Sequence, residues 1–226
     1  MVYTLYYSVK IVLVMIARGN QEVFFSHARR WAKGLLKIAD VNVNILGVDN
    51  INIDTTYVYV SNHSSLYDIP IILASLKQDV RIMYKRELEK IPVFGSMLKK
   101  SPYIGITRTN PHNAMSSIDE ALKSIKGNVS VIMFPEGTRS KDGNLGPFKR
   151  GAFSLASRSG RQIVPVAIIG STKVLASKAL ILCAHQKVTV ILNKPIQASD
   201  SPSRAEEQEL MKRIHNIISE TIKKEL

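Results

Sequence analysis

Residues 60–70 read VSNHSSLYDIP and place a histidine and an aspartate five positions apart, directly after an apolar run. The run predicts a strand, so His63 lies in the turn that follows it and Asp68 lies in the first turn of the next helix. A carboxylate there can bond one imidazole nitrogen, which fixes the tautomer and leaves the other nitrogen free to accept a proton. The pair therefore predicts a general base for a substrate hydroxyl. Ser65 and Asp68 also match a helix capping box, so the alternative that Asp68 only caps the helix stays open at this point.

A second polar cluster, FPEGTRS at residues 134–140, follows the apolar run VSVIM. A Pro-Glu-Gly-Thr turn that leaves a strand exposes backbone N–H groups and brings Arg139 to the end of the sheet, where a guanidinium can bind phosphate or carboxylate at two points. Glu136 is placed to accept a hydrogen bond from a substrate hydroxyl. The alternative is a Glu–Arg pair that only closes the turn. Arg108, straight after YIGIT, is the third strand-end position predicted to lie in the site.

The positions of these polar residues depend on the strands that precede them. After residue 40, short β-rich runs alternate with helical segments. Strands are predicted over 41–46, 57–62, 80–85, 103–107, 129–134, 163–169 and 187–192. Helices are predicted over 65–76, 93–100, 111–126, 150–158 and 203–225. This alternation predicts an α/β fold with a mostly parallel or mixed central sheet of about seven strands, flanked by helices. Ligands bind beyond the carboxyl ends of the strands in such sheets, where the three polar positions fall.

The chain is strongly basic, with 31 lysines and arginines against 18 acidic residues and a formal charge of +13. Such an excess favours polyanions, which include anionic lipid headgroups, phosphorylated substrates and nucleic acid. The alternating basic and aromatic β-face of single-strand nucleic-acid binders is missing, so no nucleic-acid partner is expected.

The first 40 residues predict a membrane-associated helical segment ahead of an α/β domain at 41–226. Residues 2–17 are largely apolar but include Lys10 and fall short of the roughly 20 residues of a full span, so this helix is expected to dip into the bilayer without clearly crossing it.

The helix predicted over 22–38 is amphipathic, a pattern typical of an interfacial membrane helix. Its apolar face is Phe24, Ala28, Trp31, Leu35 and Ile38, and its basic face is Arg29, Arg30, Lys33 and Lys37. The alternative is a helix docked on the protein's own core with its charges in solvent.

The single cysteine, Cys183, excludes an internal disulfide and lies in the apolar run ALILCAH, which predicts a buried and inert thiol. The histidines other than His63 are scattered singly, and no group of histidine, cysteine and carboxylate residues has the spacing of metal ligands. No metal or cofactor is therefore expected.

Four sequence blocks together resemble one family. NHSSLYD resembles the Asn-His-x4-Asp motif of the glycerolipid acyltransferases, and specifically of the 1-acyl-glycerol-3-phosphate (lysophosphatidic acid) acyltransferases. KRELEKIPVFG and GITR are similar to the second block of that family, FPEGTRS to the third, and IVPVAI at 163–168 to the fourth. The blocks occur in the family's order, and the resemblance covers about residues 57–170.

The resemblance implies transfer of a fatty acyl group from a thioester to the sn-2 hydroxyl of 1-acyl-glycerol 3-phosphate, which gives phosphatidic acid. His63 is implied as the general base and Asp68 as its orienter. The implied substrate-binding residues are Lys85, Arg108, Glu136, Gly137, Thr138 and Arg139, of which the two arginines hold the phosphate. The donor is left open between a coenzyme A thioester and an acyl-carrier-protein thioester, and no other cofactor is implied.

A lipid substrate implies a protein bound to an anionic membrane surface, on the cytoplasmic face of a bacterial inner membrane. Two alternatives stay open. The same chemistry fits another acceptor, such as glycerol 3-phosphate or a lyso-aminolipid. A basic membrane-binding module without catalysis also explains the charge, although it leaves the polar strand ends unexplained.

Overall fold

The computed structural model describes residues 2–107, 111–125, 129–177, 179, 181–199 and 202–225, with the backbone alone described for residues 18 and 111–117. Within these residues seven strands form one sheet, in the order β1-β7-β6-β2-β5-β3-β4. They are β1 (Asn42–Leu46), β2 (Val58–Ser61), β3 (Val80–Lys85), β4 (Ile104–Ile106), β5 (Ser130–Met133), β6 (Ile163–Ile169) and β7 (Lys187–Leu192). Strands β6, β2, β5, β3 and β4 run parallel, while β7 is antiparallel to β6 and parallel to β1. The predicted mostly parallel, mixed sheet is confirmed.

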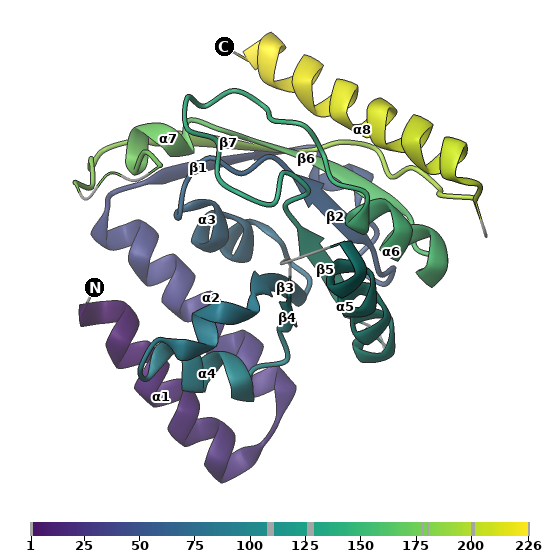
Figure 1. Cartoon of the computed structure of the whole chain (residues 1–226). Coiled ribbons are helices and arrows are strands. Elements are labelled where there is room, and N and C mark those ends of the chain that lie inside the picture. The colour runs from purple at the N-terminus through teal and green to yellow at the C-terminus, as the bar shows by residue number, and fades with distance from the viewer. Residues whose placement is uncertain are drawn as a thin grey trace.

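Helices cover both faces of this sheet (Figure 1). On one side of the sheet lie α2 (Gln21–Ile38), α3 (Asp68–Ser75) and α4 (Phe94–Lys100), and α1 (Val2–Arg18) packs outside them, on α2 and α4. The other face is covered by α5 (Pro111–Ser124), α6 (Gly151–Ser159) and α8 (Arg204–Glu225). The 3-10 helices η1 (Val48–Asn50) and η2 (Arg86–Lys90) and the short α7 (Ser171–Val174) lie in the connections. The fold is thus a three-layer α/β/α arrangement.

Strand β2 shows why the central runs are apolar at every position. Its side chains alternate between the two faces, so Tyr59 joins the core beneath α2 and α3, while Val58 and Val60 join the core beneath α5, α6 and α8. All three side chains are fully buried, because helices cover both faces of a mostly parallel sheet.

Helix α3 begins later than predicted, at Asp68 instead of residue 65. The Ser64 and Ser65 N–H groups donate to the Asp68 carboxylate, and the Ser65 hydroxyl accepts from the Tyr67 N–H. These side-chain bonds compete with helical bonding and hold residues 64–67 in turns. Helix α8, by contrast, begins with a capping box, in which Ser203 and Glu206 bond each other's backbone N–H groups.

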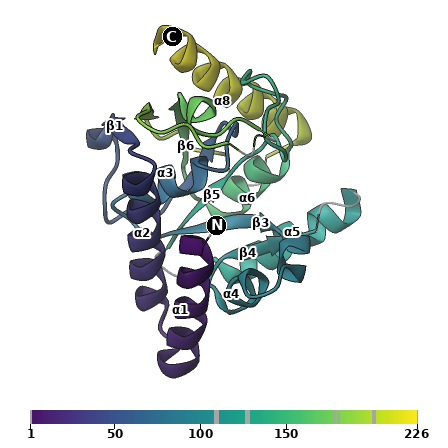
Figure 2. The same cartoon turned by 90° about the vertical axis from the view of Figure 1, so that its left-hand side faces the viewer.

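Helices α1 and α2 lie side by side, and α1 also packs on α4 (Figure 2). At Gly34 of α2 a Cβ atom would lie 1.8 Å from the Tyr3 hydroxyl oxygen of α1, because the tyrosine ring occupies the space that a side chain at residue 34 would need. The outer face of α1 carries apolar side chains that are 42–83% exposed: Val2, Leu5, Tyr6, Val9, Leu13 and Ile16. We call these six residues the α1 stripe. No helix in the described part of the chain is both long and apolar enough to cross a bilayer.

The prediction that the apolar face of α2 contacts lipid is wrong. Phe24 and Ala28 on that face are buried against the protein's own core, and of the predicted face only Ile38 is largely exposed, at 62%. Arg29 is not on a free basic face either, because its guanidinium donates to the carbonyls of Leu76, Lys77 and Gln78 and to Asp79. The hydrophobic pattern indicates an amphipathic helix correctly, but here the sheet and α3 cover it, which was the alternative.

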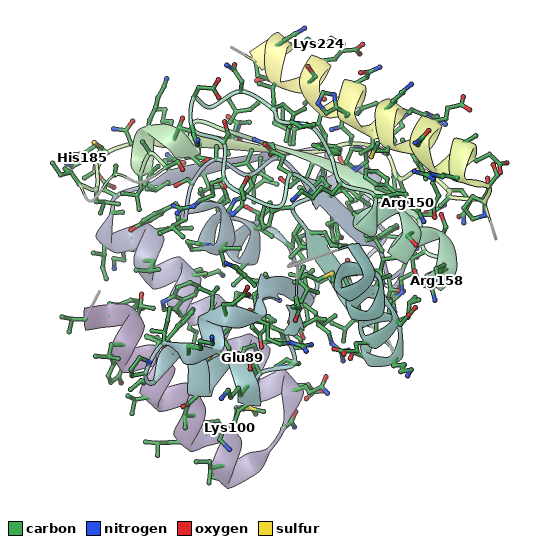
Figure 3. The ribbon with its side chains drawn as sticks, in the orientation of Figure 1. Glu89, Lys100, Arg150, Arg158, His185 and Lys224 are labelled. Atoms are coloured by element: carbon green, nitrogen blue, oxygen red, sulfur yellow. The ribbon has the colours of Figure 1, made fainter. Side chains whose placement is uncertain are left out.

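The prediction of a buried Cys183 is also wrong, since its side chain is exposed. The run ALILCAH does not form a strand but belongs to the connection between α7 and β7, at the edge of the molecule near His185 (Figure 3). Ile181 in the same connection is 78% exposed, so the apolar composition of this run does not reflect a place in the core.

Candidate active site

The polar strand ends meet at one edge of the sheet because β2 and β5 are parallel neighbours, with Val60 paired to Met133. The chain leaves β2 through Asn62 and His63, and it leaves β5 through the turn at 134–140. A backbone bond joins the two segments directly, from the Ser140 N–H to the His63 carbonyl at 2.8 Å. The predicted juxtaposition of these two motifs is therefore present.

His63 and Asp68 form the hydrogen bond that their spacing predicts. The imidazole Nδ1 lies 2.7 Å from the Asp68 Oδ2 atom. The Asp68 side chain is fully buried, while that of His63 is 17% exposed. With Nδ1–H donated to the carboxylate, Nε2 has no partner among the described residues and is free to accept a proton.

Asp68 also organises the turn that carries the imidazole. The same Oδ2 atom accepts the N–H groups of Ser64 at 2.7 Å and of Ser65 at 2.8 Å. The alternative that Asp68 has a structural role is therefore correct in part, because one of its oxygens accepts hydrogen bonds both from the backbone before α3 and from the imidazole. Oδ1 is buried and has no hydrogen-bond partner in the described part of the chain.

Two residues that the sequence did not single out fix the position of His63. The Phe134 ring stacks on the imidazole, with centroids 4.2 Å apart and an angle of 26° between the rings. The Asn62 side chain accepts the Ile168 N–H and donates to the Ile168 carbonyl, each at 2.8 Å, and so joins the end of β2 to β6. A polar amide directly after an apolar strand was the available signal for Asn62, while nothing in the sequence distinguishes Phe134 from a core residue.

Glu136 is buried, and its two oxygens are both occupied by backbone groups. Oε1 accepts the His63 N–H at 2.8 Å, and Oε2 accepts the Gly146 N–H at 2.9 Å. Burial raises the pKa of the Glu136 carboxyl above its usual value, and these two donors oppose the rise only in part. The structure therefore places Glu136 as a clamp on the His63 backbone, and its predicted contact with a substrate hydroxyl stays a prediction.

The predicted cationic residues differ in their surroundings. Arg139 is half-buried, directly before the residue that bonds His63, and it has no ion-pair partner within the described residues. Lys85, at the end of β3, is exposed and lies 3.6 Å from Glu87. Arg108 lies outside the described residues. Thr138 is exposed, and Gly137 has a φ of +77°, which favours glycine.

A cavity of about 100 Å³ opens beside this edge, between the ends of β3, β4 and β5 and helices α5 and α6. Phe134, which also stacks on the imidazole, forms part of the wall of this cavity, together with Gly137 and Lys149. The remaining lining is mostly apolar: Met83, Ile106, Thr107, Ile118, Met133, Pro135, Gly151 and Ala152. The site thus combines a hydrogen-bonded His63–Asp68 pair, an arginine-bearing turn and an apolar recess.

Known proteins with similar sequences are named as acyltransferases. A 1-acyl-sn-glycerol-3-phosphate acyltransferase from Brassica napus chloroplasts is 34% identical over 199 residues, which cover 84% of this chain and 58% of the relative. One from Helicobacter pylori is 31% identical over 189 residues, covering 82% of this chain and 78% of the relative. The chain spans only about six-tenths of the length of the plant chloroplast relatives.

A solved structure of an acyltransferase has the same fold as this chain. The crystal structure of the 1-acyl-sn-glycerophosphate (LPA) acyltransferase PlsC from Thermotoga maritima superposes with a TM-score of 0.80 at 25% identity, over 99% of this chain and 90% of that one. Residues 42–169, from β1 to the end of β6, match the family described as Acyltransferase, and they include every motif of the site described above. This chain therefore belongs to the Acyltransferase family.

Proposed function

We propose that this chain transfers a fatty acyl group from a thioester to the sn-2 hydroxyl of 1-acyl-glycerol 3-phosphate, with His63 as the general base. The observation that carries the proposal is the 2.7 Å bond between His63 and a fully buried Asp68, at the edge of the sheet where the arginine-bearing turn also lies. The names of the relatives support the choice of acceptor.

The His63 Nε2 atom takes the proton from the acceptor hydroxyl as its oxygen attacks the thioester carbonyl carbon. The imidazolium that forms is stabilised by Asp68, which stays ionised. The carbon–sulfur bond then breaks, the proton passes from the imidazolium to the thiolate, and phosphatidate and a free thiol are released. No acyl-enzyme intermediate is needed, because the attacking oxygen belongs to the substrate. The donor is a coenzyme A or an acyl-carrier-protein thioester.

The acceptor phosphate lies against the turn after β5. The Arg139 guanidinium lies in this turn and forms no ion pair with a carboxylate among the described residues. Arg108, Gly137 and Thr138 are assigned to the same phosphate and glycerol region. Lys85 is the weaker candidate, since its ammonium already lies 3.6 Å from Glu87.

The protein binds an anionic membrane surface through the α1 stripe. Six exposed apolar side chains on one helical face are the pattern of a helix that lies in the interface. Lys99 and Lys100 are exposed on α4, the helix that packs on α1. Figure 3 shows Lys100 beside α1. Each basic residue near an anionic leaflet contributes about 1 kcal/mol. We place the protein on the cytoplasmic face of a bacterial inner membrane, where both kinds of thioester donor are available.

The test is the release of free thiol from an acyl thioester that depends on added lysophosphatidate. His63→Gln should lower the rate by about 10²–10⁴ and leave binding to vesicles unchanged. His185→Gln, at an exposed position in the connection between α7 and β7, is the matched control. If the His63→Gln protein keeps the parent rate, His63 is not the general base. If glycerol 3-phosphate or a lyso-aminolipid is the better acceptor, the assignment of lysophosphatidate as the substrate is wrong.

A further inference from the structure

Lys149 is held against the turn that carries the predicted phosphate-binding residues. Its backbone N–H donates to the Pro135 carbonyl at 2.8 Å, two residues before α6 begins. Phe148, the residue before it, is buried in the core beneath α5, α6 and α8. The backbone of Lys149 is therefore anchored on both sides, although the lysine side chain itself is exposed.

The Lys149 side chain crosses the face of Gly137. A Cβ atom built on Gly137 would lie 2.9 Å from the lysine Nζ, 3.1 Å from Cε and 3.2 Å from Cδ. The missing side chain at Gly137 thus leaves the space through which the lysine stem runs. This gives Gly137 a second role besides its positive φ, because it lets an ammonium group reach the middle of the turn that ends at Arg139.

Lys149 lines the 100 Å³ cavity, whose wall also includes the Phe134 ring that stacks on His63. Within the described residues no carboxylate forms an ion pair with Lys149. Several other exposed cations do have such partners: Arg158 lies 2.6 Å from Asp119, and Arg150, between α6 and α8, lies 2.6 Å from Glu207 (Figure 3). A positioned and unpaired ammonium beside an apolar recess is the arrangement that an anionic amphiphile completes.

We infer that Lys149 binds a phosphate group of a substrate beside His63, a role that rests on the proposed acyl transfer. Two substrates carry such a group, namely the phosphate monoester of lysophosphatidate and the phosphates of a coenzyme A donor. In both cases a single charged contact positions the substrate without taking part in proton transfer. Lys149 is therefore a substrate-binding residue, and its loss should raise KM while kcat changes little.

The experiment compares the parent with Lys149→Met, which keeps the stem length and removes the charge, and with Lys149→Arg. Lys212→Met, at an exposed position on α8, is the matched control. Initial rates of thiol release are measured against lysophosphatidate, once with acyl-CoA and once with acyl-pantetheine, which lacks phosphate. Binding of short-chain lysophosphatidate and short-chain monoacylglycerol is measured by calorimetry in parallel.

We expect Lys149→Met to raise KM about tenfold, the effect of losing one charged hydrogen bond, and Lys149→Arg to restore most of it. A rise in the KM of lysophosphatidate with both donors assigns the contact to the acceptor, and a rise only in the KM of acyl-CoA assigns it to the donor. Unchanged KM values, or an equal loss for monoacylglycerol binding, overturn the inference.

The two proposals fail separately. If the parent protein binds lysophosphatidate but transfers no acyl group, and Lys149→Met weakens that binding about tenfold, the proposed activity is wrong and the Lys149 contact stands. If transfer proceeds and all Lys149 variants match the parent, the activity stands and the contact is wrong.

Discussion

The Asp68→Asn substitution separates the charge of the aspartate from its role in orienting the imidazole. Oδ2 accepts three hydrogen bonds, from the His63 Nδ1–H and from the N–H groups of Ser64 and Ser65. An asparagine placed here must point its carbonyl oxygen at these donors, because its NH₂ group would otherwise oppose two backbone N–H groups. The imidazole therefore keeps its tautomer in this variant, and only the negative charge is lost.

The cost in stability follows from the same contacts. Three charge-assisted hydrogen bonds become neutral ones, which loses about 1 kcal/mol each. The new NH₂ group replaces Oδ1, which is buried and has no partner in the described part of the chain, and an unsatisfied buried donor costs about 1–3 kcal/mol more. We expect a loss of about 4–6 kcal/mol in the free energy of unfolding, measured by urea denaturation followed by circular dichroism.

The effect on the rate should be smaller than in Ser-His-Asp triads, where the corresponding change costs about 10⁴ because the tautomer reverses. With the tautomer kept, we expect kcat for thiol release to fall by about 10² for Asp68→Asn and by about 10⁴ for Asp68→Ala. Asp49→Asn, at an exposed position in η1, is the control. Equal losses for the two Asp68 variants refute the argument that the backbone fixes the tautomer, and a parent rate in Asp68→Asn refutes a role for the charge.

Three further predictions concern the surroundings of the site. Asn62→Ala leaves the Ile168 N–H and carbonyl without their partners and should lower the free energy of unfolding by about 2–4 kcal/mol, measured by urea denaturation; a loss below 0.5 kcal/mol contradicts the bridge. Because burial raises the pKa of the Glu136 carboxyl, the native state keeps this proton to higher pH than the unfolded chain, so its contribution to stability falls as pH rises from about 4.3 to the raised pKa. The stability of the parent relative to Glu136→Gln should therefore decline through this window in urea titrations, and a difference independent of pH contradicts the raised pKa. The double variant Leu13→Ser/Ile16→Ser on the α1 stripe should bind anionic vesicles at least tenfold more weakly in a sedimentation assay, while the midpoint of urea denaturation stays the same. If vesicle binding is unchanged, α1 is not the membrane contact.

The sequence predicts the sheet well because each central strand is apolar on both faces and is bounded by turn residues. Strands β3, β6 and β7 begin and end where the sequence predicts. The sequence also predicts the edge of the sheet at which the site forms, because neighbouring parallel strands place their carboxyl ends together. The bond between His63 and Asp68 could be predicted from sequence spacing alone, since His63 lies in the short connection after β2 and Asp68 is the first residue of α3.

Periodicity could not show which surface covers an amphipathic helix. The apolar face of α2 is as regular as that of an interfacial helix, yet Phe24 and Ala28 lie in the core, while the α1 stripe remains uncovered. The contacts of Phe134 and Lys149 likewise depend on which distant segments the fold brings together. Cys183 illustrates the same limit, because an apolar run beyond the last turn of α7 has no strand neighbour to bury it.

Two buried carboxylates at the edge of the sheet hold His63, the proposed general base, in place. Glu136 fixes the His63 N–H and Asp68 fixes its ring and the two following N–H groups, so the residue is held from both β5 and α3. Burying the Glu136 carboxylate costs free energy that its two N–H donors offset only in part, as the raised pKa of this carboxyl shows. That cost fits the mechanism proposed above, in which the imidazole must not reorient while the hydroxyl of a lipid attacks and the proposed phosphate contacts hold the other end of that lipid.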